Sequence, residues 1–152
     1  MIPRYTRPEM GALWSEDAKY ARWLRVELAV CDAWARRGVV PADALDRIHA
    51  RARVDAARIE EIESRVRHDV IAFLTDLEGS IGTDSRFVHV GLTSSDVVDT
   101  ALALALVEAA DRLITGVDRL RESLRRLALR HRDTLTVGRT PGLHAEPPTF
   151  GL

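Results

Sequence analysis

A proline-free stretch of helical character, from Asp96 to about Arg132, constrains the fold of this chain most strongly. At 1.5 Å per residue a helix of this length would be roughly 55 Å long, which is more than one small domain needs. Its first half, residues 97–110, is apolar on nearly every side, as is typical of a helix buried against several neighbours. We therefore expect other long helices, from other subunits or from further sequence, to cover it. The second half has a narrower apolar stripe, made of Leu113, Val117, Leu120, Leu124 and Leu127.

Four further segments have apolar residues at helical spacing, with start or stop signals beside them. No segment alternates with a period of two for long enough to make a strand. The first residues, up to Leu13, contain Pro3 and Pro8 and are expected to be extended or irregular. The signals are Ser15 and Gly38 for the first helix, Pro41 for the second, Asp55 for the third, and Gly79 with Gly82 at the end of the fourth.

These patterns predict an all-α fold in two parts. Residues 1–93 are expected to form a small N-terminal helical domain. Residues 94–152 are expected to form the start of a central helical-bundle domain, in which the first long helix is followed by a loop containing glycine and proline. A chain of 152 residues has enough sequence for one ordinary core, but not for a second full domain.

Composition narrows the class of protein further. The 22 basic residues nearly cancel the 23 acidic ones, so no overall field favours nucleic acid or an anionic membrane as a partner. The single cysteine, Cys31, has no disulfide partner, which suits a reducing cytosol. The first residues lack the apolar core of a signal peptide, and the longest apolar run, 101–107, is too short to cross a bilayer. We expect a soluble, cytoplasmic protein, and we expect no metal site because the histidines show no ligand spacing.

The first of three polar clusters is Arg67-His68-Asp69, at a break between two helical patterns. Its simplest interpretation is a capped helix start with incidental charges. The alternative is an anion-recognition corner, in which arginine and histidine donate hydrogen bonds and aspartate fixes the imidazole tautomer. These three residues alone leave both interpretations open.

The second cluster runs from His89 to Asp96, at the start of the long helix. Backbone N–H groups at a helix start are unpaired and carry the positive end of the helix dipole, so hydroxyls there can cap the helix or help to hold an anion. A cap needs only one hydroxyl or Asp96, whereas three hydroxyls are present, on Thr93, Ser94 and Ser95. Again a cap and a binding site both remain possible.

The third cluster, residues 138–147, contains two glycines and a proline in addition to Arg139, Thr140, His144 and Glu146. This composition predicts a turn. Polar residues in such loops often serve function, although an exposed connection between two helices would look the same.

Together these stretches resemble the adenylosuccinate lyase family, the purine-pathway branch of the fumarase/aspartase superfamily. The motifs occur in the family's order and at matching separation over essentially the whole chain. By this resemblance the chain corresponds to the N-terminal part of such an enzyme, whose long helices assemble from four subunits into one bundle. The motifs are Arg4-Tyr5 with Pro8-Glu9-Met10, Arg67-His68-Asp69-Val70, the run from His89 to Thr100, and Gly138-Arg139-Thr140 with His144-Ala145-Glu146-Pro147 and Thr149-Phe150-Gly151.

The resemblance implies a β-elimination that releases fumarate from adenylosuccinate, giving AMP, and from the succinyl-carboxamide ribotide of purine biosynthesis. It implies small-molecule partners and a homotetramer, with no cofactor, nucleic acid or membrane. It also implies roles for individual residues. Arg4 and Tyr5 would help to hold the nucleotide phosphate, with His89 supporting that side; Arg67, His68 and Asp69 would line the substrate pocket; Thr93 and Ser94 would bind the succinyl end; and Thr140 would also bind substrate.

The chain departs from the family pattern at two positions, one within the third cluster and one directly after it. The family has Thr-His-Gly where this chain has Thr140-Pro141-Gly142, and that histidine is the family's proposed general acid. Proline has no ionisable group and no backbone N–H, so Pro141 cannot take over this role. Pro148 stands where threonine is usual. The serine loop that supplies the family's base would lie beyond Leu152, and we therefore expect a truncated chain that is inactive by itself.

Two other functions fit the same residues. One is catalysis by another lyase of the superfamily, such as argininosuccinate lyase or a cycloisomerase, although Arg4-Tyr5 with Arg67-His68-Asp69 favours the nucleotide substrate. The other is a helical assembly module that keeps the bundle helix but has lost catalysis, which Pro141 favours.

Overall fold

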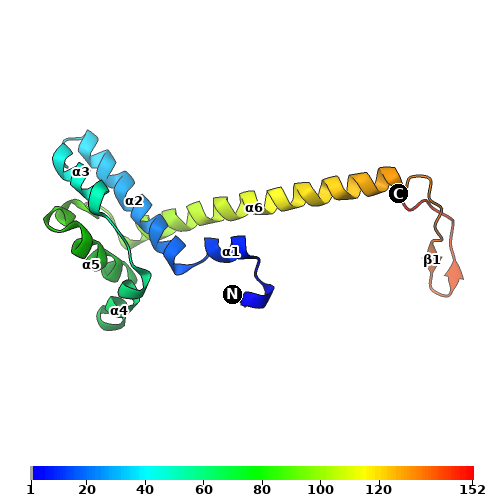
Figure 1. Cartoon of the computed structure of the whole chain (residues 1–152), viewed down its shortest axis with the longest axis horizontal. Helices are drawn as coiled ribbons and strands as arrows, with labels where there is room; N and C mark the ends of the chain where they lie inside the picture. Colours follow the sequence, from blue (N-terminus) through cyan, green and yellow to red (C-terminus); the bar gives the residue numbers. More distant parts are fainter. Residues whose placement is uncertain (1) are drawn as a thin grey trace. The chain divides into compact units, whose positions relative to one another are not determined.

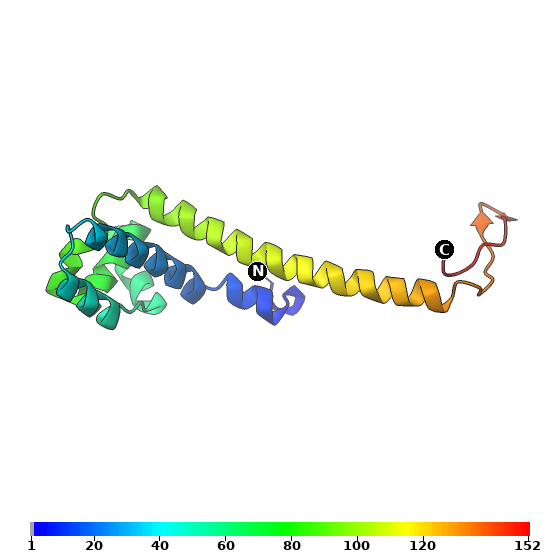
Figure 2. The same cartoon turned by 90° about the horizontal axis from the view of Figure 1, so that it is seen from above.

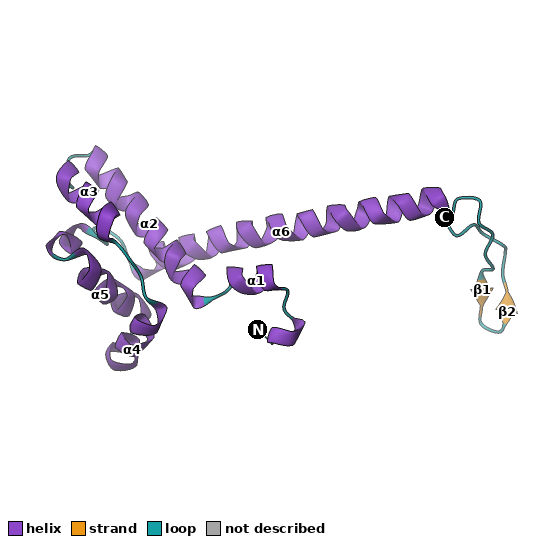
Figure 3. Cartoon of the chain, viewed as in Figure 1, coloured by secondary structure: helices purple, strands orange, loops and turns teal. Residues whose placement is uncertain are grey.

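A computed structural model describes residues 2–152 of the chain. The described residues form six α-helices, two short 3-10 helices and one small hairpin (Figure 1, Figure 3). The chain divides into two compact units, one extending to Ala109 and the other comprising Ala110–Leu152. The elements are η1 (Pro3–Tyr5), α1 (Pro8–Leu13), α2 (Glu16–Arg36), α3 (Ala42–Arg51), α4 (Ala56–Val66), α5 (Asp69–Ile81), η2 (Thr83–Phe87), α6 (Ser94–Arg130), β1 (Arg139–Thr140) and β2 (Leu143–His144). This confirms the predicted all-α class.

The helix starts follow the capping residues read from the sequence. The Ser15 hydroxyl accepts the Ala18 N–H at 3.2 Å, and an Asp55 carboxylate oxygen accepts the N–H groups of Ala57 and Arg58. Each bond satisfies a backbone donor that a helix leaves unpaired at its first turn. Pro41 differs from the prediction slightly, because it is the residue before α3 and not part of the helix.

The prediction of an irregular segment up to Leu13 was wrong. Pro8 is the first residue of α1, a position where the missing N–H costs nothing and the fixed φ suits a helix. The same proline that suggested a break therefore starts a short helix. At its end Leu13 is buried, and Met10 packs against the same small cluster as Leu13.

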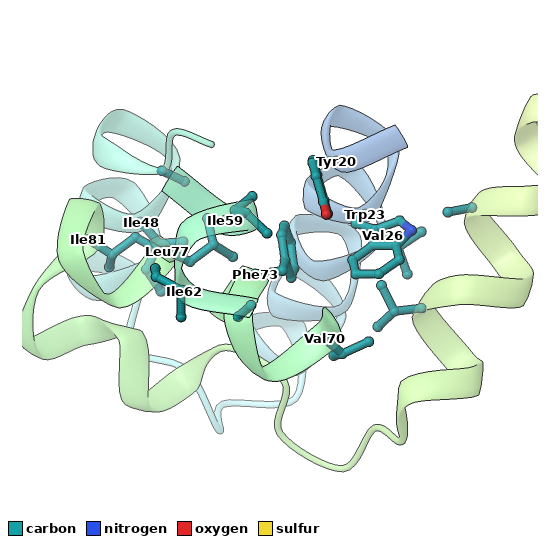
Figure 4. Close-up of a cluster of buried hydrophobic side chains, with 14 of the residues drawn as sticks. Tyr20, Trp23, Val26, Ile48, Ile59, Ile62, Val70, Phe73, Leu77 and Ile81 are labelled. Atoms are coloured by element: carbon teal, nitrogen blue, oxygen red, sulfur yellow. The ribbon is translucent and has the colours of Figure 1, made fainter. Parts of the chain in front are cut away.

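The main core of the first unit lies between α2, α3, α4 and α5 (Figure 4). Its centre is an aromatic group, in which Phe73 stacks on Tyr20 at 6.2 Å between ring centroids and meets Trp23 edge-on at 5.4 Å. Ile48 and Ile59 are fully buried beside them. Burying a side chain of this size stabilises a fold by about 1.5–3 kcal/mol, so this cluster fixes the arrangement of the four helices.

Within the first unit, α1 and α2 lie beside the beginning of α6 (Figure 2). The side of α6 that they cover is narrow and has small side chains, with Val97, Ala101, Ala105 and Ala109 buried at intervals of four. Arg22 of α2 is paired with Glu108 of α6 at 2.8 Å. Leu102, Leu106 and Val107 are 48%, 54% and 61% exposed. The described residues therefore cover only one side of this stretch.

The second unit consists of the remainder of α6 and the residues after it. The apolar stripe predicted from the sequence is exposed here, from Leu113 at 62% to Leu127 at 47%. After α6, β1 and β2 pair antiparallel with Thr140 opposite Leu143, and Leu135 forms a single bridge with Thr149. No strand was predicted in this region, because two-residue strands are too short to show an alternating pattern.

None of the described helices is long and apolar enough to cross a membrane.

Candidate functional site

The loop between η2 and α6 is held in place by one face of α2. Three side chains at positions i, i+4 and i+7 of that helix contact it. Glu27 binds His89, the Trp34 indole N–H donates to the Val90 carbonyl at 2.8 Å, and the Cys31 thiol lies 3.6 Å from the Phe87 carbonyl. Side chains at this spacing lie on the same side of a helix, so α2 holds the end of η2 and two residues of the loop.

Glu27 contributes both carboxylate oxygens to His89. Oε1 lies 2.6 Å from the imidazole Nδ1, and Oε2 accepts the His89 backbone N–H at 2.9 Å. Glu27 is only 1% exposed, and a buried carboxylate is tolerated when it is paired in this way. With the carboxylate against Nδ1, that nitrogen carries the proton.

Cys31 has no nucleophilic role in this arrangement. Burial raises the pKa of its thiol to about 11, and the negative charges of Glu27 and Asp32 act in the same direction. The thiol therefore stays protonated at neutral pH and donates weakly to the loop carbonyl.

Two of the predicted site residues have an unusual backbone conformation. Arg67, with φ of 56°, and His89, with φ of 63°, are the only non-glycine residues with positive φ in the described part of the chain. Residues other than glycine seldom adopt positive φ values, because the side chain crowds the backbone there. Such strain is typical of functional positions, because the surrounding structure must stabilise it.

At the first cluster, the helix-cap interpretation holds for His68. Its Nδ1 accepts the Ile71 N–H at 3.4 Å, and Asp69 accepts the N–H of Val70 at 2.7 Å. Asp69 lies 3.5 Å from the same nitrogen, so it does not contact the other ring nitrogen, as the anion-recognition alternative would suggest. Arg67 is exposed, and its side chain makes no hydrogen bond or ion pair with the described residues. An unpaired guanidinium is therefore open to solvent next to the cap.

At the start of α6 the cap is also complete. Asp96 accepts both the Thr93 N–H at 2.7 Å and the Thr93 hydroxyl at 3.0 Å. The Thr93 N–H and then its hydroxyl lower the pKa of Asp96, and the charge of His89 acts in the same direction. Thr93 therefore uses its only hydroxyl proton within the cap. The half-buried Ser94 and the exposed Ser95 have no side-chain hydrogen bond among the described residues, so both hydroxyls are available to a ligand.

The two clusters belong to one packed unit. Val70, next to Asp69, is buried in the main core (Figure 4). Val97, next to Asp96, is buried in the same core, and Val88 and Leu92 pack against it. Arg4 and Tyr5 lie in η1, where the guanidinium is 4.8 Å from the tyrosine ring centre. Both are exposed, and no side-chain hydrogen bond or ion pair joins them to the other predicted residues in the described part of the chain.

Thr140 and Pro141 lie in the hairpin of the second unit. Pro141 and Gly142 form the two-residue turn between β1 and β2, and Gly142 has φ of 76°. Proline suits the first central position of such a turn, and glycine is required at the second. Pro141 therefore fits the turn, and its consequence is the absence of an ionisable side chain at that point.

Glu27 was not among the residues predicted from the sequence. The available signal was an acid within an apolar helical pattern, four residues from both Trp23 and Cys31. A carboxylate at such a position must have a buried partner, although the sequence does not say which. In the described residues no group of three His, Cys, Asp or Glu side chains is arranged to hold a metal ion.

Comparison with known proteins gives matches over nearly the whole chain. The model of a protein family described as "Lyase" matches residues 4–152. The adenylosuccinate lyase of Aquifex aeolicus is 51% identical over 155 residues, and that of Synechocystis sp. is 52% identical over 152 residues. Both alignments cover all of this chain, but only 36% and 35% of those relatives. The chain thus spans about a third of the length of the curated relatives it matches.

Solved structures have the same fold. The 3-carboxy-cis,cis-muconate lactonizing enzyme from Pseudomonas putida is 34% identical with a TM-score of 0.86, over 97% of this chain and 35% of that one. The fumarate lyase from Mesorhizobium sp. BNC1 is 30% identical with a TM-score of 0.85, over 94% of this chain and 34% of that one.

Proposed function

The chain belongs to the lyase family, and we propose on this premise that it is the N-terminal part of an adenylosuccinate lyase. The proposed reaction is the β-elimination of fumarate from adenylosuccinate and from the succinyl-carboxamide ribotide of purine biosynthesis. The strongest support for the proposal comes from the conformation of the loop at His89. A buried carboxylate holds a strained histidine beside the start of α6, as expected for a side chain required in one position.

In this proposal the first unit binds the substrate's anionic groups. Arg4 and Tyr5 contact the phosphate, and His89 supports the same side. Arg67, His68 and Asp69 line the pocket, and the unpaired Arg67 guanidinium is suited to a carboxylate or phosphate. Ser94 contacts the succinyl end with its free hydroxyl. Thr93 contributes only if its hydroxyl is released from Asp96.

Elimination needs three things from the complete enzyme. A base removes a proton beside a carboxylate, fixed donors stabilise the charge that develops there, and an acid protonates the departing nitrogen. We propose that Thr140 also binds substrate in the complete enzyme, and that Pro141 occupies the position of the general acid. We propose that the chain as given binds substrate without turning it over.

The exposed stripe of α6 supports assembly with further copies of the same chain. Five apolar side chains at intervals of three and four, each about half exposed or more, form an apolar face whose exposure to water is unfavourable. Closed assemblies of identical chains are the commonest oligomers of soluble proteins. We propose a cytoplasmic homotetramer in which α6 helices cover one another.

A calorimetric titration of the chain with adenylosuccinate, with fumarate absorbance followed in parallel, tests this proposal. We expect heat of binding without fumarate. Fumarate release would show that Pro141 does not prevent catalysis. Absence of binding would contradict a substrate site within this chain.

Two alternatives are supported by particular observations. Another lyase of the superfamily is favoured by the likeness to the muconate lactonizing enzyme, and a panel of argininosuccinate, adenylosuccinate and carboxymuconate would distinguish the substrates. A non-catalytic assembly module is favoured by Pro141, and an oligomer indifferent to every nucleotide tested would support it.

A further inference from the structure

Glu27 is the most deeply buried acidic residue of the described chain, and none of the proposed catalytic steps uses it. We propose that Glu27 is a positioning residue that fixes the tautomer and direction of His89, so that the imidazole Nε2 is presented to an anionic group of the substrate. The part of this inference that concerns substrate rests on the proposed function. The part that concerns the imidazole stands on the geometry alone.

The two hydrogen bonds hold His89 at two separate points. The backbone bond of 2.9 Å fixes the N–H of a residue with φ of 63°, and the side-chain bond of 2.6 Å fixes the ring. In an imidazole the two nitrogens point in widely different directions. With Nδ1 directed at Glu27, Nε2 must be directed away from the buried carboxylate.

The neighbouring bonds prevent the loop from adjusting around His89. Trp34 holds the next carbonyl, that of Val90, and its ring lies close to Gly91, where an added Cβ would come within 3.3 Å of it. Before His89, the Cys31 thiol lies 3.6 Å from the Phe87 carbonyl, so α2 contacts the chain on both sides of the histidine in the sequence. The His89 side chain remains 20% exposed, whereas Glu27 is closed off from solvent.

Anion recognition explains the Glu27–His89 pair better than a contribution to the stability of the fold does. A buried ion pair often contributes no more to stability than apolar side chains of the same volume would. Here the buried partner is the carboxylate, and the partly exposed partner is an imidazole whose second nitrogen is free of it. A hydrogen bond from Nε2 to an ionised phosphate or carboxylate is charge-assisted, and such a bond is stronger than a neutral one.

The test compares Glu27→Gln and Glu27→Asp with the natural chain by ¹⁵N NMR of the imidazole rings. His89 is assigned from the signals lost in His89→Gln. We expect Nδ1 of the natural chain to be protonated, Glu27→Gln to change the His89 ring signals, and Glu27→Asp to restore them partly, because it keeps the charge on a shorter side chain.

Asp32→Asn is the matched control. Asp32 lies on the same helix and pairs with His49 at 2.7 Å through Nε2, but this pair is half exposed and remote in sequence from the loop. The control should change the signals of His49 and leave those of His89 as they are. Thermal melts of all variants establish that each one folds.

Titration with adenylosuccinate separates the two parts of the inference. We expect Glu27→Gln to weaken binding by about tenfold or more, Glu27→Asp to weaken it less, and Asp32→Asn to leave it unchanged. His89 ring signals that are identical in the natural chain and in folded Glu27→Gln would overturn the positioning role. If the ring signals change as expected but no variant, nor the natural chain, binds adenylosuccinate, the proposed function fails while the control of His89 by Glu27 stands.

Discussion

Gly91 is the residue at which the loop before α6 tolerates least change. Its φ of 76° is unfavourable for any side chain, and an added Cβ would lie 3.3 Å from the Trp34 ring. We expect Gly91→Ala to lower the free energy of unfolding by about 1 kcal/mol or more, because it adds backbone strain and displaces the indole that holds Val90. Urea denaturation followed by circular dichroism measures this change.

Gly116→Ala is the matched control for this substitution. Gly116 lies within α6, and an added Cβ meets no atom within 4 Å. Alanine is the better helix former, so this change should raise the unfolding free energy by up to about 1 kcal/mol. Opposite signs are expected for the same chemical change, and a stabilising Gly91→Ala would contradict the structure of the loop.

At the scale of helices, local signals in the sequence predicted most of the fold. Ser15 and Asp55 act as caps as expected, and Gly82 ends α5. These signals are reliable because a helix end must satisfy its backbone groups within a few residues. Burial was harder to predict, since Ile71 follows the apolar pattern of α5 but is 47% exposed.

The candidate site was predictable only in part. The clusters at Arg67 and His89 were visible because polar residues gather there, and the structure adds backbone strain at both. The bond between Glu27 and His89 joins residues 62 positions apart, and no local pattern reports such a pairing. The sequence could indicate that Glu27 needs a partner, but only the packing of the loop against α2 identifies it.

The apolar stripe on the second half of α6 makes a prediction about assembly. Leu120 is 59% exposed at its centre, and a charge there would have to be desolvated if another helix covers it. We expect the natural chain to self-associate and Leu120→Glu to weaken that association by at least about tenfold, as measured by sedimentation velocity over a range of concentrations.

Thr115→Glu supplies the control for this experiment. It adds the same charge to the same exposed helix, but Thr115 lies on the side away from the stripe and bonds only to the Asp111 carbonyl. Association should be little changed by it. Equal effects of the two substitutions would show that charge, and not the apolar face, governs assembly.

For the whole molecule, the proposed activity depends on position 141. The question is whether histidine in place of Pro141 would restore fumarate release in a complete enzyme. The site in the first unit keeps its paired histidine and its exposed arginine, and the turn at Pro141 has the geometry that Gly142 requires. Pro141 should therefore reduce activity because it provides no proton donor, and it should leave the fold unchanged. Histidine at this position needs no change of backbone, because the positive φ belongs to Gly142.

A chimera tests this directly, in which residues 1–152 are joined to the part of the Aquifex aeolicus relative that lies beyond the matched region. A positioned general acid typically contributes about 10²–10⁴-fold to a rate, so Pro141→His should accelerate fumarate release from adenylosuccinate by a factor in that range. Pro148→Thr, the other departure from the family pattern, should change the rate far less, and melting temperatures should be similar for all three chimeras. Equal rates for proline and histidine at 141, in chimeras that bind substrate, would mean that the acid is supplied by another residue, since proline has no proton to give.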